Sequence, residues 1–339
     1  MNVPGIGKAV GLLALLVFPL VGFSDYVLHI SILILLWGFI YTAWSVMGRF
    51  GLISLGHGAF MAIGAYVVTL LWNHAGVTPW IGMLVAVLVA VAVGFLIGFP
   101  CFRFRITGHY FALVTLALSE VARLLIVALR DTTGGSLGIT PDRVISAEQP
   151  SSFYALQFAD KVTWFYIVLG VWIAGLVIWR SVDRSMMRFA MEAISRDEDA
   201  AASLGVRVTR TKLVVTMISA AMTAIGGVVY GQYQLYINPE TTSGISISLQ
   251  IVFAAIAGGM FVQLGPTVGA AITLLLAETL RQAVGHDVHG LDVVIYGAML
   301  VLFIIYMPRG VLGQLLASWE RAGKRFSGFT GKLKPDAAG

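Results

Sequence analysis

Long apolar segments joined by short connections dominate this sequence and restrict the folds open to it. Inside hydrocarbon a chain must satisfy its backbone hydrogen bonds internally, and segments near the ~20 residues that cross a bilayer favour helices. The sequence contains ten such runs, at residues 9–24, 27–47, 52–72, 80–102, 109–129, 162–180, 212–235, 246–264, 266–284 and 291–307. We therefore predict an all-α integral membrane protein with about ten transmembrane helices, in a range of eight to ten.

The distribution of charge supports this class and predicts an orientation. Only 12% of the residues are charged, against roughly a quarter in an average soluble domain. Basic residues concentrate on alternate connections: Lys8, Arg49, Arg103 with Arg105, the segment 180–212, and the tail after Met307. Because basic residues favour the cytoplasmic side of short loops, both termini are predicted to be cytoplasmic. The net charge of +5 then reflects membrane topology, and binding of nucleic acid is not expected.

The hydropathy pattern predicts one polytopic domain over residues 1–315 and a basic cytoplasmic tail over 316–339. Within the domain, 130–161 is expected to be an external loop that holds a short helix or a strand pair. The segment 180–212 is expected to be a cytoplasmic loop. The first apolar run lacks the small-residue cleavage pattern of a signal peptide, so we predict that it is an uncleaved span.

Glycines interrupt two of the apolar runs and define a candidate translocation path. Broken helices persist in a bilayer only where the freed backbone groups face protein or water, and breaks in corresponding parts of two pseudo-repeated halves indicate a transport path. The predicted path residues are Ser54, Gly56, His57, Gly58, Gly258, Gly259, Gly265 and Pro266. Alternatively, the small residues only permit close packing and His57 is a hydrogen-bonded core residue. One broken run could also be re-entrant.

Two similar segments place charges inside predicted spans. TLALSEVAR at 115–123 and TLLLAETLR at 273–281 each carry a glutamate and an arginine one helical turn apart. Charge inside a membrane is rare and marks a functional candidate, which makes Glu120, Arg123, Glu278 and Arg281 candidate functional residues. The alternative is structural, because opposite charges at this spacing can neutralise each other.

The segment EAISRDEDAAASLGVRVTR, residues 192–210, concentrates charge between two apolar runs. Ser195 followed by Glu198 predicts a capping box, Asp197 and Asp199 suit the positive end of a helix dipole, and Gly205 suits a left-handed stop. This predicts a helix of two to three turns, preceded by a short surface helix through SMMRFAMEAI. The helix is either a solvated connection or a docking element for a cytoplasmic partner, with Ala200 to Ala202 and Leu204 as its apolar contact.

A resemblance favours the docking element. Glu192 and Ala193, followed by a gap that ends at Gly205, resemble the EAA loop of ABC-importer permeases, which inserts into a groove of an ATPase subunit. Six motifs then occur in the order of one family: GLISLGHGAFMAIGAY (51–66), GHYFALVTLALSEVARL (108–124), TGGSLGI (133–139), AISRDEDAAASLGVRVTRTKL (193–213), GPTVGAA (265–271) and MPRGVLG (307–313). Between about residues 30 and 315 the chain is similar to the branched-chain amino-acid ABC-transporter permease family of the LivM type.

The resemblance implies a transport subunit in the bacterial cytoplasmic (inner) membrane that hydrolyses nothing itself. Residues that would couple it to an ATPase are Glu192, Ala193, Ser195, Asp197, Glu198, Asp199, Ala202 and Gly205. The implied partners are a second, LivH-like permease, two LivG/LivF-like ATPases and an extracytoplasmic amino-acid-binding protein. In agreement, the sequence contains no phosphate-binding loop, so ATP and Mg²⁺ are expected only at the partner subunits and this chain is expected to bind no cofactor.

Other functions stay open from the sequence. The implied cargo is a branched-chain or related hydrophobic amino acid, but urea, short amides or aromatic acids would suit the same machine. The family usually has aspartate where Leu137 stands, and a more regular glycine-rich segment than GGMFVQLGP. An ion-coupled secondary transporter that uses the Glu/Arg pairs is the alternative from another class. A membrane enzyme is disfavoured because it needs converging nucleophiles or metal ligands, whereas the histidines are scattered and no residues show metal-ligand spacing. Separately, the single Cys101 excludes an intrachain disulfide and hence a disulfide scaffold.

Overall fold

The computed structural model describes residues 11, 13–146 and 148–284, together with 297–298, 302 and 310–315. Most of the last predicted span, 291–307, and the beginning of the first, 9–24, lie outside the described residues. The predicted number of ten spans is therefore tested only between these two runs. The tail 316–339 and the side chain of Arg281 also lie outside the described residues.

Seven described helical segments are long and apolar enough to cross a membrane. They are α2 (Asp25–Gly48), α3 (His57–Ala75), α4 (Pro79–Arg103), α5 (Gly108–Ala128), α7 (Lys161–Arg184), α10 (Val208–Gln234), and the pair α11 (Pro239–Thr242) with α12 (Gly244–Gly258). A further helix, α13 (Gly265–Val284), has a shorter apolar part. The prediction of a helical, multi-pass membrane protein is confirmed.

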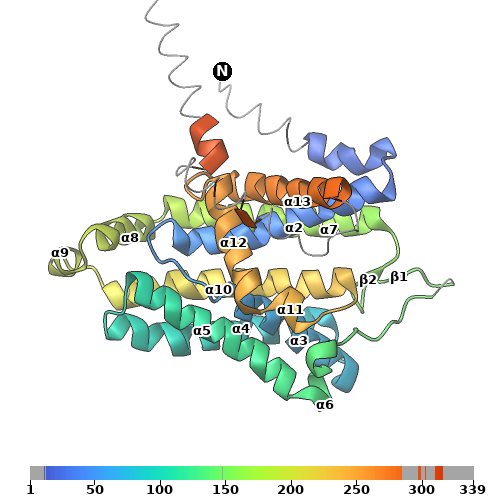
Figure 1. The fold of residues 1–339 in the computed structure, drawn as a ribbon, viewed down its shortest axis with the longest axis horizontal. Helices are drawn as coiled ribbons and strands as arrows, with labels where there is room; N and C mark the ends of the chain where they lie inside the picture. Colours follow the sequence, from blue (N-terminus) through green and yellow to red (C-terminus); the bar gives the residue numbers. More distant parts are fainter. Residues whose placement is uncertain are drawn as a thin grey trace, which may run out of the picture.

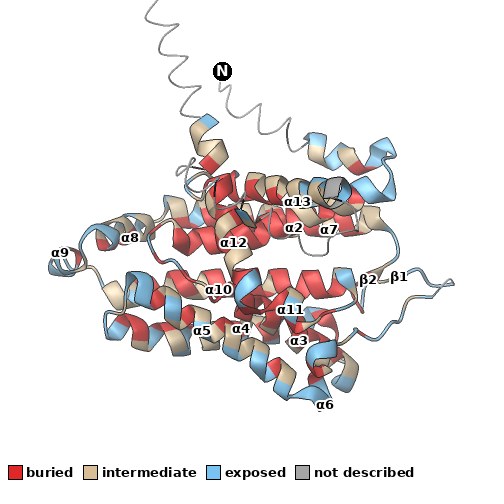
Figure 2. Cartoon of the chain, in the orientation of Figure 1, coloured by how far each residue is buried: buried red, intermediate tan, exposed pale blue. Residues whose placement is uncertain are grey.

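The long helices run along the longest axis of the molecule in two layers (Figure 1). Helices α2, α7 and α13 form one layer and α3, α4 and α5 the other, with α10 between them. The hydrophobic windows of α2 and α10 are 78% and 72% buried, whereas that of α5 is only 22% buried. Figure 2 shows the same difference, with buried residues along α2 and α10 and exposed ones along the outer face of α5. Exposed apolar side chains on α4 and α5 are suited to lipid, where they carry no hydrophobic penalty.

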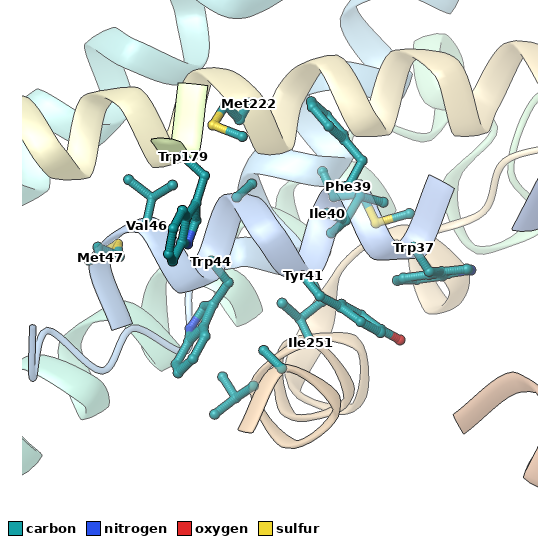
Figure 3. Packing of buried hydrophobic residues seen from close by; sticks show 14 of the residues in the cluster. Trp37, Phe39, Ile40, Tyr41, Trp44, Val46, Met47, Trp179, Met222 and Ile251 are labelled. Carbon is teal, nitrogen blue, oxygen red and sulfur yellow. The ribbon is translucent and has the colours of Figure 1, made fainter. Parts of the chain in front are cut away.

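The hydrophobic core is centred on the C-terminal half of α2. Trp44 and Tyr41 are fully buried and pack with Trp179 of α7, Met222 of α10 and Ile251 of α12 (Figure 3). Both tryptophan indoles have hydrogen-bond partners, because Trp44 Nε1 donates to the carbonyl of residue 54 at 2.8 Å and Trp179 Nε1 donates to the hydroxyl of residue 45 at 3.1 Å. A large aromatic core with its polar atoms satisfied fixes α2 at the centre of the bundle.

Helix α12 crosses the long helices and does not run alongside them (Figure 1). At its start, the Gly244 carbonyl accepts a hydrogen bond from Ser119, which lies in the middle of α5, at 3.1 Å. At its end, Gly258 packs on the start of α13, whose Thr267 contacts Gly38 in the middle of α2. Both ends of α12 thus lie at a middle depth of the bundle. Together, α11 and α12 have the length and composition to cross a membrane, and both the full span over 246–264 and its re-entrant alternative stay predictions.

The remaining elements lie at the two ends of the bundle. One end carries α8 (Met186–Arg196) and α9 (Glu198–Ser203), and the other carries α6 (Arg130–Thr133), the 3-10 helix η2 (Gly135–Leu137), and strands β1 (Ser151–Ser152) and β2 (Gln157–Phe158). A second 3-10 helix, η1 (Phe18–Val21), precedes α2. The strands pair antiparallel, with Ser151 opposite Phe158. The expectation that 130–161 holds a short helix or a strand pair is confirmed, and the loop contains both.

Candidate functional site

The charged segment 192–210 comprises the end of α8, all of α9 and the start of α10, and the helix pair α8–α9 projects from one end of the bundle (Figure 1). The predicted surface helix before it is confirmed as α8, and the predicted capped helix is α9. The predicted capping box is wrong: Ser195 lies within α8 and donates to the carbonyl of Glu192, whereas Asp197 caps α9. The Asp197 carboxylate accepts hydrogen bonds from the amides of Asp199 and Ala200, both at 2.9 Å.

Helix α9 has six residues and is therefore shorter than predicted. It ends as expected at Gly205, whose φ of +87° is a backbone conformation that favours glycine. The Val206 amide donates to the Ala201 carbonyl and the Gly205 amide to that of Ala202, at 3.1 and 2.9 Å. These two bonds form a Schellman motif. Both ends of α9 are thus fixed by local hydrogen bonds.

Apolar contacts hold the inner face of the helix pair against the bundle. Met191 and Ile194 of α8 and Ala201 of α9 are buried in the main hydrophobic core. Ala201 is therefore not available as a docking contact, contrary to the prediction. Ala200 and Ala202 are exposed, and Leu204 is 84% exposed. The outward surface of α9, defined as Ala200, Ala202 and Leu204, is consequently apolar with acidic residues at its edge.

Ion pairs connect the helix pair to three other parts of the chain. Glu198 of α9 pairs with Lys212 of α10, which is 2% exposed. Asp199 of α9 pairs with Arg105, between α4 and α5, at 2.9 Å, and both of these side chains are largely exposed. Exposed pairs contribute little to stability because water screens them, so the pair that contains the buried lysine is the stronger constraint.

A third connection runs from α8 to the end of α2. Arg188 Nε contacts Glu192 at 2.7 Å and its guanidinium lies 3.5 Å from Asp183. The same carboxylate oxygen of Asp183 contacts Arg49 at 3.1 Å. The hydrogen bond that Arg188 donates to Glu192 and the charge of Asp183 raise the pKa of Arg188, while burial lowers the pKa of Arg49 to about 10. Arg49 stays charged at neutral pH and also stacks over the Trp179 ring, with its guanidinium carbon 4.0 Å from the centroid.

A cavity of about 280 Å³ lies between the helix pair and the bundle. It is lined by residues of the α2–α3 connection, the α4–α5 connection, both helices of the pair, and α10: Phe50, Gly51, Leu52, Thr107, Gly108, Met191, Ile194, Ser195, Arg196, Asp197, Glu198 and Lys212. Protein interiors are otherwise closely packed. The helix pair is therefore anchored at its contacts but has open space beneath it.

The first glycine break is a non-helical segment, 49–56, that leads into α3. Ser54 is 2% exposed, and its hydroxyl accepts from the Gly56 amide at 3.2 Å. The Thr115 hydroxyl of α5 accepts from the backbone amide of residue 55 at 2.9 Å. The Gly58 amide donates to the Ser248 hydroxyl at 3.3 Å, and a Cβ at Gly58 would lie 2.7 Å from the hydroxyl oxygen of Ser119. The freed backbone groups thus face protein, and the segment is closed in this conformation.

His57 is fully buried at the start of α3, in contact with α10. Its Nε2 lies 2.8 Å from the Ser219 hydroxyl, which donates to the Ala43 carbonyl at 2.7 Å. Since that hydroxyl hydrogen is already used, His57 Nε2 must be the donor and Nδ1 an acceptor. Nδ1 has no partner among the described residues. The contact joins α2, α3 and α10 by one polar chain. A role of His57 in the translocation path stays a prediction.

The second glycine break is a close crossing of α12 and α13. Gly259 follows α12 with a φ of +115°, and Gly265 and Pro266 begin α13. A Cβ at Gly258 would lie 2.1 Å from the Gly265 carbonyl oxygen, and a Cβ at Gly265 would lie 1.8 Å from that of Gly259. The glycines are therefore required for packing. A role in the path stays a prediction, as does the pseudo-repeat of the two halves.

The predicted charge pair of α5 is present and has a third member. Arg123 contacts Glu120 at 2.5 Å and Glu240, at the start of α11, at 3.2 Å. On α13, Glu278 accepts from the Tyr26 hydroxyl at 2.6 Å, while Arg281 lies outside the described side chains. The two segments thus differ in environment. Glu120 and Arg123 are paired as their spacing allows, and a functional role of the four charges stays a prediction.

Comparison with known protein families identifies the family to which this chain belongs. Residues 26–304 match the model of a family described as the branched-chain amino acid transport system / permease component. The chain belongs to this family. The match covers every described long helix and the α8–α9 pair, so the features above are those of a family member.

Individual relatives agree with the permease family. The chain is 32% identical over 284 residues to the high-affinity branched-chain amino acid transport system permease protein LivM of Salmonella typhimurium, and equally to that of Escherichia coli. These matches cover 79% of this chain and 65% of the relatives. The Escherichia coli permease LivH is 28% identical over 280 residues, which is 88% of its length. No solved structure matches the chain.

Several residues of the site were not singled out from the sequence. Lys212 and Arg49 were treated only as basic residues of connections and Asp183 was not considered, but the structure makes all three anchors of the α8–α9 pair. One signal was available, because Lys212 directly precedes an apolar run and a lysine there must find a partner. The described residues contain no group of three or more side chains suited to a metal ion.

Proposed function

We propose that this chain is a transmembrane permease subunit of an ABC importer and that α8–α9 is the element that docks on a cytoplasmic ATPase. The observation that carries the proposal is the outward surface Ala200, Ala202 and Leu204, presented by a short helix with both ends fixed. A solvated connection would not need an exposed leucine beside two exposed alanines. Exposed apolar groups with a charged edge are typical of protein interfaces.

The proposed machine contains a second, LivH-like permease, two LivG/LivF-like ATPases and an extracytoplasmic binding protein. The relatives of this chain include both LivM and LivH, which supports a pair of related permease subunits. The chain would lie in the bacterial inner membrane with both termini and α8–α9 on the cytoplasmic side, since the basic connections Arg103 to Arg105 and 180–212 lie at the end that carries this pair. ATP and Mg²⁺ would bind only to the ATPases.

We propose a branched-chain or related hydrophobic amino acid as the cargo. This rests on the names of the relatives, which are branched-chain amino acid permeases. A zwitterion crossing hydrocarbon needs polar groups that replace water. The buried hydroxyls of Ser119, Ser248 and Ser219 supply such groups at the middle of the bundle. Closure of the ATPases would move α8–α9, and the permease pair would then alternate between two states.

Co-purification from native membranes tests the docking role. The tagged wild-type chain is expected to retain ATPase subunits, identified by mass spectrometry, and a Leu204→Asp, Ala202→Arg variant is expected to lose them. Leu137→Asp is the matched control, because Leu137 is 71% exposed at the opposite end of the bundle. Loss of the ATPases in both variants, or their absence from the wild-type sample, would contradict the proposal.

A further inference from the structure

Lys212 occupies an unusual position for a lysine. It lies in the first turns of α10 with only 2% of its side chain exposed, and its ammonium lies 5.6 Å from the Phe102 ring centroid. A buried ammonium is strongly unfavourable unless an anion compensates it. The carboxylate that does so, Glu198, comes from α9, a six-residue helix outside the bundle. The charge balance of the core therefore depends on the position of α9.

Helix α10 continues from Lys212 into the centre of the protein. Seven residues further along, Ser219 binds both the Ala43 carbonyl of α2 and His57 at the start of α3. Beyond it, Gly227 packs against the backbone of α3 at Met61. A single helix of 27 residues thus connects the Lys212–Glu198 pair to the closed segment in front of α3.

Apart from the buried contact of Ala201, the other contacts of α9 allow it to move. Its second ion pair, Asp199 with Arg105, is largely exposed, so it holds the helix only weakly. The cavity of about 280 Å³ beneath the helix pair is lined by Glu198 and Lys212 themselves and by the 50–52 segment. A displacement of α9 can therefore take place into open space, while the buried ion pair keeps α9 attached to α10.

We propose that the Glu198–Lys212 ion pair is the positioning contact that transmits movement of α9 to α10 and thereby to the polar contacts of His57 and Ser219. This rests on the proposed function, in which an ATPase docks on α9. Neither residue touches the cargo in this role. Breaking the pair should leave docking intact and uncouple ATP hydrolysis from transport.

The test uses the complete complex in proteoliposomes and measures L-leucine uptake together with ATP hydrolysis. Glu198→Gln and Glu198→Lys are each expected to lower the leucine transported per ATP about tenfold while the ATPases still co-purify. Glu198→Lys combined with Lys212→Glu is expected to restore the ratio to within about threefold of wild type, because the pair is re-formed with reversed charges. The matched control reverses the ion pair of Asp25 and Lys161 at the other end of the bundle, Asp25→Lys with Lys161→Glu, and is expected to keep the wild-type ratio.

A neutral double variant, Glu198→Gln with Lys212→Met, guards against misfolding because it leaves no unpaired charge buried. It is expected to assemble and to remain uncoupled. A wild-type ratio in this variant or in Glu198→Gln would overturn the proposal, and so would loss of the ATPases on Glu198→Gln or a charge-reversed pair that stays uncoupled. If wild type itself carries no ATPase, the proposed function fails first, which distinguishes the two failures.

Discussion

Gly64 of α3 and Gly227 of α10 lie where the two helices touch backbone to backbone. A Cβ at Gly64 would lie 2.0 Å from the Ala224 carbonyl oxygen, and a Cβ at Gly227 would lie 2.0 Å from that of Met61. Such contacts bring helices together where hydrocarbon gives no hydrophobic driving force between them. This crossing fixes α3 on α10 and therefore places His57 beside Ser219.

Adding one methyl group at this crossing should separate the helices. Gly64→Ala is expected to lower the stability of the folded chain by about 1–3 kcal/mol, the usual penalty of overpacking. Gly170→Ala on α7 is the matched control, because a Cβ there meets nothing within 4 Å. Thermal denaturation in detergent, followed by size-exclusion chromatography, measures the difference. Equal midpoints for the two variants would contradict the close contact.

The cap of α9 gives a second prediction. Asp197→Ala removes the acceptor for the amides of Asp199 and Ala200 and is expected to destabilise α9 by about 1 kcal/mol. Amide hydrogen exchange over 198–204 should accelerate accordingly. Ser195→Ala is the control, since its hydroxyl donates to the Glu192 carbonyl of its own helix and does not cap α9. Faster exchange in Ser195→Ala than in Asp197→Ala would restore the capping box predicted from the sequence.

The polar contact between His57 and Ser219 gives a third prediction. Ser219→Ala removes the acceptor of His57 Nε2–H and leaves that group buried without a partner, so a loss of about 1–3 kcal/mol is expected. Ser181→Ala is the comparison, because Ser181 is exposed and its hydroxyl donates to the Val177 carbonyl of its own helix. Thermal midpoints of the two variants, measured side by side in detergent, provide the check. A Ser219→Ala midpoint no lower than that of Ser181→Ala would argue against the assigned hydrogen bond.

The energy source of transport separates the importer from an ion-coupled transporter. In proteoliposomes that contain the whole complex, leucine uptake is expected to require ATP and to continue when a protonophore and a sodium ionophore collapse the ion gradients. The ion-coupled alternative would use Glu120 and Arg123, which form an ion cluster with Glu240, in its charge relay. Gradient-driven uptake without ATP would favour the charge-relay alternative.

The sequence by itself determined the class of protein and the place of most helices. Hydrogen bonding in hydrocarbon is satisfied within a helix, so an apolar run such as 162–180 predicts a helix whatever surrounds it, and the structure has α7 at Lys161–Arg184. The left-handed stop at Gly205 was equally predictable, because it depends on the backbone of one residue. The six family motifs were also a property of the sequence alone.

Tertiary structure decided what depends on distant neighbours. Helix α12 has the composition of a span, but its direction follows from glycine contacts with α13 and a hydrogen bond to Ser119. Asp197 and Ser195 are both good caps locally, and the break between α8 and α9 selects Asp197. From the sequence, Lys212 was one of several basic residues in a cytoplasmic connection. In the structure its side chain is buried and paired with Glu198. Burial and pairing arise from segments far apart in the chain, which local sequence patterns do not specify.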